Sequence, residues 1–488
     1  MSDHFPVFSM LGMLLLMMAA AMGAPIAVSY ALHDRMADSF AIGMGVTGIA
    51  GLVLWLGLRR HGTEMQPRHG LLLVALAWIV MPLFAAIPLL LAFDALGRPL
   101  SLVHAYFETV SGLTTSGGTV LSGLDTLPVS VNFWRTFLQW MGGMGLLILA
   151  VAVLPLLGVG GSQLFKVEAA GPLKDNKLTP RITQTAKGLW SVYAGMSVLC
   201  ALVYWWAGMR PLDALMHMFT TVSLGGLSSY DTSLGHFQSL RVELVAMLFM
   251  LLASCNFALY FSAMRKGHLA GFWRDPELRA TLGLMLASGL FVSLLLWVKH
   301  VYPLAQALRY GMFNTISVAS TTGYATADYL HWPIFAPVLL LLLSGVASSA
   351  GSTGGGIKMV RLLILLKQAK RELQRLSHPR AVRPVTLGGK VVDNHVIFAV
   401  LAFIFMYGCT VLVLTMVLLL TDLDLVTAFT AVLASVNCMG PGLGEVGPHS
   451  NFSVLTDFQI AVCTLGMLLG RLEMLSFIAL LMPGFWRK

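Results

Sequence analysis

Charged residues and patterned cysteines are scarce in this sequence of 488 residues. Only 11% of the residues are charged and 57% are hydrophobic, whereas about 25% of the residues of a soluble globular domain are charged. The five cysteines follow neither the C-x-x-C spacing of a zinc site nor the regular spacing of a disulfide framework. A soluble enzyme and a small domain held by disulfides or zinc are therefore excluded.

Catalytic motifs are absent too. The sequence contains no Walker motif, no H-E-x-x-H and no G-x-S-x-G, so we predict neither catalysis nor ATP hydrolysis. The histidines, among them His104, His217 and His331, lack metal-ligand spacing and are predicted to be surface or packing residues. The net charge of +9 does not indicate nucleic-acid binding, because the basic residues lie in short runs between apolar stretches.

Long apolar stretches are abundant in the sequence, whose mean hydropathy is +0.80. Each long stretch could cross about 30 Å of hydrocarbon as a helix. The first has no Lys or Arg before it and a second follows at once, so we interpret it as a retained helix and not a signal peptide. Ten such stretches lie at 8–32, 37–58, 71–93, 136–158, 189–209, 242–263, 280–298, 335–357, 395–420 and 455–483.

The distribution of Lys and Arg predicts the orientation in the membrane. The loops after the second, fourth, sixth and eighth stretches, together with the C-terminal tail, hold 23 of the 31 basic residues. Basic loops stay on the cytoplasmic side. We therefore expect those loops and both termini to be cytoplasmic, and membrane lipid to surround the chain.

Four segments on the opposite side resemble one another. Each has about ten apolar residues that lead to a glycine, and these anchoring glycines are Gly117, Gly226, Gly323 and Gly440. We interpret this as internal duplication. The predicted organisation is two N-terminal helices (1–69) and four repeats, at 70–186, 187–275, 276–390 and 391–488.

Each segment is predicted to begin as a short helix that enters the membrane only halfway. Ser101, Asp213 and Asp424 are N-cap candidates, and Pro303 suits a first turn. Such a helix ends with its carbonyl groups at the bilayer midplane, where irregular backbone must line a cavity. Four converging ends would form a ring of carbonyls of the kind that replaces the water around a potassium ion. The predicted ring residues are Thr114, Thr115, Ser116, Gly117, Leu224, Gly225, Gly226, Thr321, Thr322, Gly323, Asn437, Cys438, Met439 and Gly440.

Residues 348–356 are nine consecutive small residues within the eighth stretch. Glycine and β-hydroxyl residues weaken a helix, so we expect this intramembrane segment to break the helix and act as a gate. Close helix packing is the alternative, although packing needs a small residue only at every fourth position. The predicted gate residues are Ser352, Thr353, Gly354, Gly355 and Gly356.

Two basic residues are candidates for the ion pathway. Arg471 is the one arginine well inside an apolar stretch, where a charge must face protein or water. It is either a cation beside the pore or the buried partner of an acid. Lys358 either belongs to the gate or extends to the cytoplasmic surface. Glu473 is the only acid expected deep within a stretch.

Five stretches of sequence resemble the Trk potassium-uptake proteins of bacteria, in the superfamily that includes the Ktr and HKT proteins. They are FWRTFLQWMGGMG (133–145), LFKVEAAGPLKDNKLTPRI (164–182), STTGYATADYLHWP (320–333), AGSTGGGIK (350–358) and NCMGPGLG (437–444). The two extra N-terminal helices favour Trk over Ktr. Leu224 and Leu227 depart from the family, which usually has a Thr-like residue and Phe there.

The resemblance implies an all-α membrane protein with ten transmembrane helices and four re-entrant pore loops, as pseudo-fourfold repeats around one pore. It also implies potassium as the transported substrate, location in the bacterial inner membrane, assembly as a homodimer, and control by a cytoplasmic nucleotide-binding subunit of the TrkA type. The resemblance places Arg471 at the pore. A symporter that couples potassium to protons or sodium is the alternative function, and such a protein usually has a titrating carboxylate at the midplane.

Overall fold

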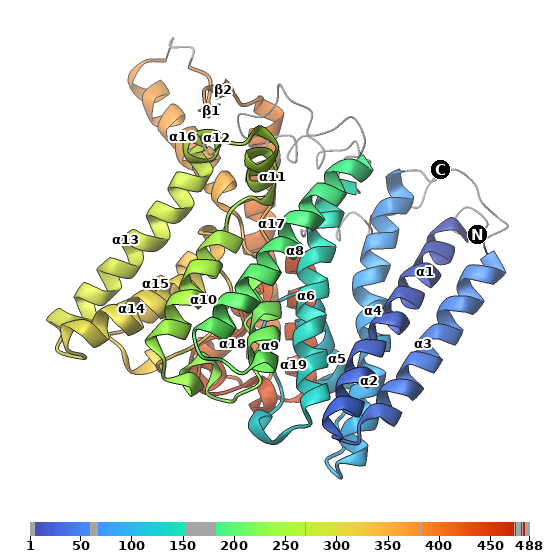
Figure 1. Cartoon of the computed structure of the whole chain (residues 1–488). Coiled ribbons are helices and arrows are strands. Elements are labelled where there is room, and N and C mark those ends of the chain that lie inside the picture. Colours follow the sequence, from blue (N-terminus) through green and yellow to red (C-terminus); the bar gives the residue numbers. More distant parts are fainter. Residues whose placement is uncertain are drawn as a thin grey trace.

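The computed structural model of the chain is almost entirely helical (Figure 1). It describes residues 5–58, 67–152, 182–268, 270–379 and 383–472, together with 474, 480 and 482–483. Glu473 and most of the stretch 164–182 lie outside the described residues.

The first three helices form an N-terminal unit: α1 (Phe5–Ala21), α2 (Gly23–Leu32) and α3 (Ala37–Leu58). The helices α1 and α3 cross closely, because a Cβ at Gly12 would lie 2.7 Å from the carbonyl oxygen of Gly51. The loop after α2 attaches this unit to α6 (Val129–Ala152), where the backbone N–H of Ser130 donates to Asp34 at 2.9 Å.

Four similar segments follow, each with a long helix, a short helix and a returning helix. The long helices are α4 (Pro67–Ala95), α8 (Ile182–Trp206), α13 (Pro276–Val298) and α17 (Asn394–Leu419). The short helices are α5 (Leu102–Leu113), α9 (Pro211–Val222), α14 (Leu304–Ala319) and α18 (Leu425–Asn437). The returning helices are α6, α10 (Leu240–Ala253) with α11 (Phe257–Lys266), α15 (Phe335–Val346) with α16 (Met359–Ser377), and α19 (Asp457–Arg471).

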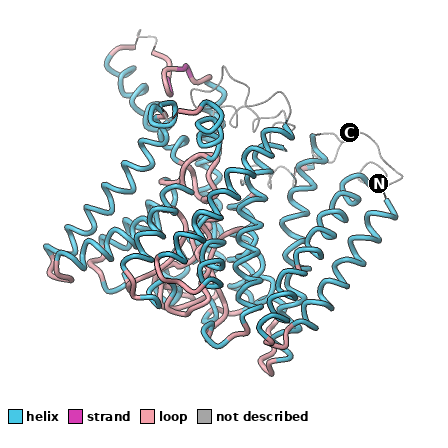
Figure 2. The backbone as a smooth tube through the Cα atoms, viewed as in Figure 1, coloured by secondary structure: helices cyan, strands magenta, loops and turns pink. Residues whose placement is uncertain are grey.

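The connections contain small elements of their own. These are the helix α12 (Ala270–Arg274), the strands β1 (Thr386–Leu387) and β2 (Lys390–Val391), which pair as an antiparallel hairpin, and the 3-10 turns η2 (Leu124–Thr126), η4 (Ser233–Phe237), η5 (Tyr329–His331), η6 (Gly444–Val446) and η7 (Phe452–Val454). Figure 2 shows loop segments inside the helical shell, in the half of the molecule that holds α5, α9, α14 and α18. Irregular backbone therefore lies in the interior of this fold.

Within the described residues, six helical segments are long and apolar enough to cross a membrane: Phe5–Leu32, Ala37–Leu58, His69–Ala95, Ala186–Trp206, Pro276–Val298 and Asn394–Leu419. They coincide with six of the ten predicted stretches. The prediction of one continuous helix at 242–263 is wrong, because α10 and α11 meet at an angle of 85°. Asn256 caps α11 by accepting from the N–H of Ala258 at 2.9 Å, so a new helix begins there in another direction.

The short helices begin largely as their capping residues predict. Ser101 accepts from the N–H of His104, and Asp424 from the N–H of Thr427. Pro303 immediately precedes α14. The prediction for Asp213 is wrong: it lies inside α9, which begins at Pro211, and its buried carboxylate accepts instead from the hydroxyl of Tyr230 at 3.1 Å. Proline at the first helical position supplies the start signal there.

Candidate ion pathway

The backbone after each short helix repeats one conformation four times. The anchoring glycines Gly117, Gly226, Gly323 and Gly440 all have positive φ, between 71° and 89°. The residue two positions earlier is also left-handed in each quarter, although none is glycine: Thr115, Leu224, Thr321 and Cys438. The residue between each pair is not left-handed. Alternation of this kind turns successive carbonyl groups to the same side of the chain, as a carbonyl ring requires.

Contacts between these glycines close the four segments into a ring. A Cβ at Gly117 would lie 2.1 Å from the oxygen of Gly225, and one at Gly226 would lie 1.8 Å from the oxygen of Thr322. A Cβ at Gly323 would lie 2.1 Å from the oxygen of Met439. The fourth contact returns to the first quarter, since a Cβ at Gly440 would lie 3.3 Å from the oxygen of Ser116. Each quarter therefore touches the next in chain order around one centre.

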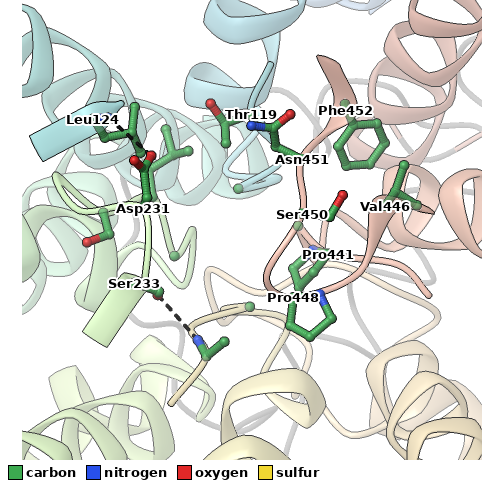
Figure 3. A pocket seen from close by; sticks show the side chains of 18 of the residues that line it. Thr119, Leu124, Asp231, Ser233, Pro441, Val446, Pro448, Ser450, Asn451 and Phe452 are labelled. Atoms are coloured by element: carbon green, nitrogen blue, oxygen red, sulfur yellow. Dashed lines mark hydrogen bonds between the residues drawn. The ribbon is translucent and has the colours of Figure 1, made fainter. Parts of the chain in front are cut away.

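One cavity lies on the side of the ring where the loops after the anchoring glycines run, and it is bounded by all four quarters (Figure 3). Gly117, Gly226, Gly323 and Gly440 line it together with the loops that follow them. Hydrogen bonds between quarters hold this rim: the carboxylate of Asp231 accepts from the N–H of Leu124 at 3.1 Å, and Asn451 donates to the carbonyl of Leu121 at 3.1 Å. The predicted ring residues are thus brought together around a shared opening.

Polar side chains on the short helices hold the backbone that leaves the ring. In the first three quarters this side chain belongs to the residue nine positions before the anchoring glycine. In the fourth quarter it belongs to the residue ten positions before it. Their hydrogen bonds are Glu108 with the N–H of Val120 (3.1 Å), His217 with the hydroxyl of Ser228 (3.0 Å), Asn314 with the N–H of Thr326 (3.2 Å) and Thr430 with the N–H of Leu443 (2.9 Å). The ring is therefore braced from behind at equivalent positions.

The first quarter adds a buried ion pair to this brace. Arg135 of α6 donates to Glu108 at 2.7 Å, and neither side chain is exposed to solvent. The same guanidinium donates to the carbonyl of Ser228, beyond the second anchoring glycine, at 3.3 Å. Arg135 therefore links the first and second quarters.

One ring carbonyl is engaged by the protein itself. The side-chain amide of Gln139, on α6, donates to the oxygen of Gly225 at 2.8 Å and accepts from the N–H of Leu227 at 3.1 Å. An ion at this position would share the carbonyl oxygen with Gln139. Asn437, predicted as a ring residue, directs its side chain away into packing, where it contacts Tyr407 and Ser344 at 2.7 and 2.9 Å.

A non-helical segment lies on the other side of the ring. The helix α15 ends at Val346 and α16 begins at Met359, so residues 347–358 form the break that the small residues predict. The hydroxyl of Thr353 donates to the carbonyl of Val222, and the N–H of Gly355 donates to the hydroxyl of Thr321 at 3.0 Å. A Cβ at Gly355 would lie 2.0 Å from the oxygen of Asn437. The segment thus packs against the base of three quarters.

Both candidate basic residues reach this segment. Arg471 donates to the carbonyls of Thr353 at 3.2 Å and of Gly142 at 3.4 Å. No ion pair to an acid is found for Arg471 among the described residues, which do not include Glu473, so both alternatives for Arg471 stay predictions. The ammonium of Lys358 donates to the carbonyl of Gly354, so it contacts the non-helical segment.

Four buried charged residues were not singled out in the sequence: Arg135, Arg361, Glu243 and Glu108. Arg135 and Arg361 are each 1% exposed and lie just outside the predicted apolar stretches 136–158 and 335–357, so the expectation that Arg471 is the one arginine well inside a stretch stays a prediction. Glu243, in the first turn of α10, is buried and pairs with Arg309 of α14 at 2.7 Å, but it lies at the end of its apolar stretch, and the expectation for Glu473 stays a prediction. Glu108 could have been found by its place in the repeat, since it occupies the position that His217 holds in the second quarter.

Known proteins with this architecture are similar over the full length. The chain matches the TrkH family, described as cation transport protein, over residues 37–484. It is 42% identical over 485 residues to the Trk system potassium uptake protein TrkH of Vibrio parahaemolyticus, with 99% of each chain covered. It is 39% identical to the Trk system potassium uptake protein TrkH of Escherichia coli, with 99% of this chain and 100% of that protein covered.

The crystal structure of the potassium transporter TrkH from Vibrio parahaemolyticus resembles this structure with a TM-score of 0.91 at 39% sequence identity, over 100% of this chain and 99% of that chain. These relatives are named as uptake proteins or transporters and not as enzymes. The family predicted from the sequence is thereby confirmed. The chain belongs to the TrkH family of cation transport proteins.

Proposed function

We propose that this chain takes up potassium across the bacterial inner membrane through the ring formed by its four anchoring segments. The observation that carries the proposal is the fourfold repeat of left-handed backbone, from Thr115 and Gly117 to Cys438 and Gly440. Backbone carbonyls that face one axis can replace the hydration shell of a potassium ion. The printed names of the relatives, which are potassium uptake proteins, support the same substrate.

The membrane arrangement belongs to the same proposal. Ten transmembrane helices cross the bilayer, with both termini in the cytoplasm, and α5, α9, α14 and α18 are re-entrant. The units are the N-terminal helices (1–69) and the pore repeats 70–186, 187–275, 276–390 and 391–488. The sequence repeat and the recurring long, short and returning helices support this division.

Residues 348–356, with Lys358 and Arg471, form the gate in this proposal. A positive charge close to the ring raises the energy of a passing cation, and the carbonyl of Thr353 holds the guanidinium at that place. The resemblance to Trk proteins extends the proposal to a homodimer, and to a cytoplasmic TrkA-type nucleotide-binding subunit that acts on the gate.

The test is the reversal potential of the purified protein in liposomes under opposed gradients of potassium, sodium and pH. Passive, potassium-selective conduction predicts a reversal potential that follows the potassium gradient alone. A reversal potential that follows pH or sodium would instead identify the coupled symporter. Liposomes without protein are the control for leak.

A further inference from the structure

The elbow between α10 and α11 has two faces, and its inner face contacts the gate segment. The N–H of Phe257 donates to the carbonyl of Gly351 at 3.0 Å, and the N–H of Ser349 donates to the carbonyl of Ser254 at 3.1 Å. A Cβ at Gly351 would lie 2.7 Å from the side-chain oxygen of Asn256. The two backbones therefore form a tight reciprocal contact. A displacement of the elbow would displace residues 349–351 as well.

The outer face of the elbow carries an apolar groove of about 530 Å³ between α8, α10 and α11. Its walls include Val192, Leu199, Phe249 and Leu252, and Met264 closes one side. Such a lining offers almost no partner to a polar ligand, which would lose its hydration without compensation. The groove therefore fits a hydrocarbon chain.

The shape of the groove follows from two glycines on α8. A Cβ at Gly188 would lie 2.2 Å from the ring of Phe261, so α8 and α11 touch at that level. About two turns further along α8, Gly195 lines the groove, and a Cβ there would meet no atom within 4 Å. The helices thus meet at one end and leave open space at the other.

The end of the groove beside the last turn of α11, away from the elbow, is basic. His268 lines it, Lys266 belongs to the last turn of α11, and Lys187 lies one turn before the lining residue Ser191 on α8. All three of these side chains are exposed. The sequence contains no Asp or Glu from 182 to 212 or from 244 to 268. The nearest acid beyond α12, Asp275, is occupied as the N-cap of α13, where it accepts from the N–H of Leu278 at 2.8 Å.

We propose that this groove binds an anionic phospholipid, with an acyl chain between α8 and α10 and the phosphate group at Lys187 and Lys266. An apolar groove with a basic end complements a hydrocarbon chain with an anionic head, and each basic residue near an anionic headgroup strengthens the binding. The bound lipid supports the elbow from outside. It thereby stabilises the contact between Phe257 and Gly351 on the inner face.

The test compares phosphatidylglycerol with phosphatidylcholine on the purified full-length protein. Native mass spectrometry measures the retained lipid, and the melting temperature is recorded with each lipid. Two variants probe the groove: Gly195→Trp fills it, and Lys187→Gln with Lys266→Gln removes its charge. Their matched controls are Gly283→Trp, at an exposed α13 position where a Cβ meets no atom within 4 Å, and Lys299→Gln with Lys370→Gln, both exposed.

We expect the wild type and both controls to retain phosphatidylglycerol and to gain melting temperature from it. Each groove variant should bind it on the order of tenfold more weakly while melting like the wild type without lipid. Hydrogen exchange of residues 345–359 should slow on addition of phosphatidylglycerol in the wild type and in both controls, and should stay unchanged in the groove variants. Equal binding of phosphatidylcholine, unchanged binding in the groove variants, or equal losses in the controls would each overturn the proposal.

Discussion

The left-handed residue two before each anchoring glycine carries a different side chain in every quarter: Thr115, Leu224, Thr321 and Cys438. An L-residue in this conformation costs about 1–2 kcal/mol, and the surrounding structure must offset that cost four times. The four residues share a backbone conformation and no side-chain chemistry. The ring is thus specified by its backbone, so a leucine can occupy the same conformation as a threonine or a cysteine.

Gly323→Ser is expected to reduce selectivity for potassium over sodium by about tenfold, equivalent to about 1.4 kcal/mol. The new Cβ would lie 2.1 Å from the oxygen of Met439, and φ is 82°, so the third and fourth quarters must separate. Ion ratios from reversal potentials measure the effect. Gly283→Ser is the control, since its Cβ meets no atom within 4 Å. An unchanged ratio in folded Gly323→Ser protein would remove the third quarter from the proposed filter.

Glu108→Gln is expected to destabilise the protein by about 3–5 kcal/mol, because it leaves the Arg135 guanidinium buried without its counter-charge. The melting temperature should fall further than in Glu243→Gln, whose partner Arg309 is 26% exposed and can be hydrated. A second change, Arg135→Met, should restore part of the stability. An equal fall in melting temperature in Glu108→Gln and Glu243→Gln would show that the pair of Glu108 and Arg135 stabilises the fold no more than the pair of Glu243 and Arg309.

Arg471→Ala is expected to increase flux. At an effective dielectric constant of about 20, a unit charge about 6 Å from a passing cation raises its energy by roughly 3 kcal/mol, enough to slow conduction by about two orders of magnitude. Arg471→Lys keeps the charge and is the control. Uptake and melting temperature are measured on the same preparation. Lower flux with a large loss of stability would identify Arg471 as a structural residue instead.

At the scale of elements, the breaks in two returning helices lie against each other. The elbow at Ser254 and Asn256 contacts the segment that interrupts the eighth stretch, through Ser349 and Gly351. A further hydrogen bond joins Ala350 to the carboxylate of Glu277 at the start of α13. The first part of the segment 347–358 is therefore held by the elbow and by the start of α13, while Thr353 and Gly355 contact the base of the ring.

Removal of residues 351–354 is expected to raise basal uptake without a change in selectivity. The shortened segment could no longer reach the carbonyl of Val222 or hold Arg471 through Thr353, whereas the anchoring glycines are untouched. Uptake and ion ratios in liposomes measure the two effects separately. If uptake disappears while the melting temperature is preserved, the segment is structural packing and not a gate.

At the scale of the whole molecule, Asp34 attaches the N-terminal helices to the repeats. Burial raises the pKa of Asp34, but hydrogen bonds from Ser29, Ser130 and Met36 outweigh it and hold the pKa below its ordinary value of 3.8. The stabilisation is therefore complete above that value and is lost as the pH falls through the lower pKa of the folded state. Asp34→Asn should melt a few degrees lower at neutral pH, because a partly exposed group contributes modestly.

The difference in melting temperature between Asp34→Asn and the wild type should shrink as the pH is lowered through about 4. Asp38→Asn is the control, since Asp38 is an exposed residue in the first turn of α3. A difference that stays constant down to a pH of about 3 would show that the carboxylate charge of Asp34 does not hold the two units together.

The sequence was sufficient for features that are local or repeated. Hydropathy located six long helices, the repeats located the anchoring glycines, and the small residues located the break at 347–358. It was insufficient where distant elements determine a role. The bend at Asn256 depends on the space beside the gate segment, and the burial of Glu108 depends on Arg135, which lies 27 residues away. A charged residue in a short apolar segment reveals its partner only when the helices are packed.

The ion pair between Glu108 and Arg135 occurs in the first quarter alone, and this has a consequence for symmetry. A channel built from four identical subunits would repeat any charged brace four times around the axis. A single chain that carries four unequal copies can instead place an ion pair, a histidine and an amide at one position of three quarters, and a hydroxyl one residue earlier in the fourth. The side chains behind the ring therefore differ from quarter to quarter, while the backbone conformation of the ring stays the same.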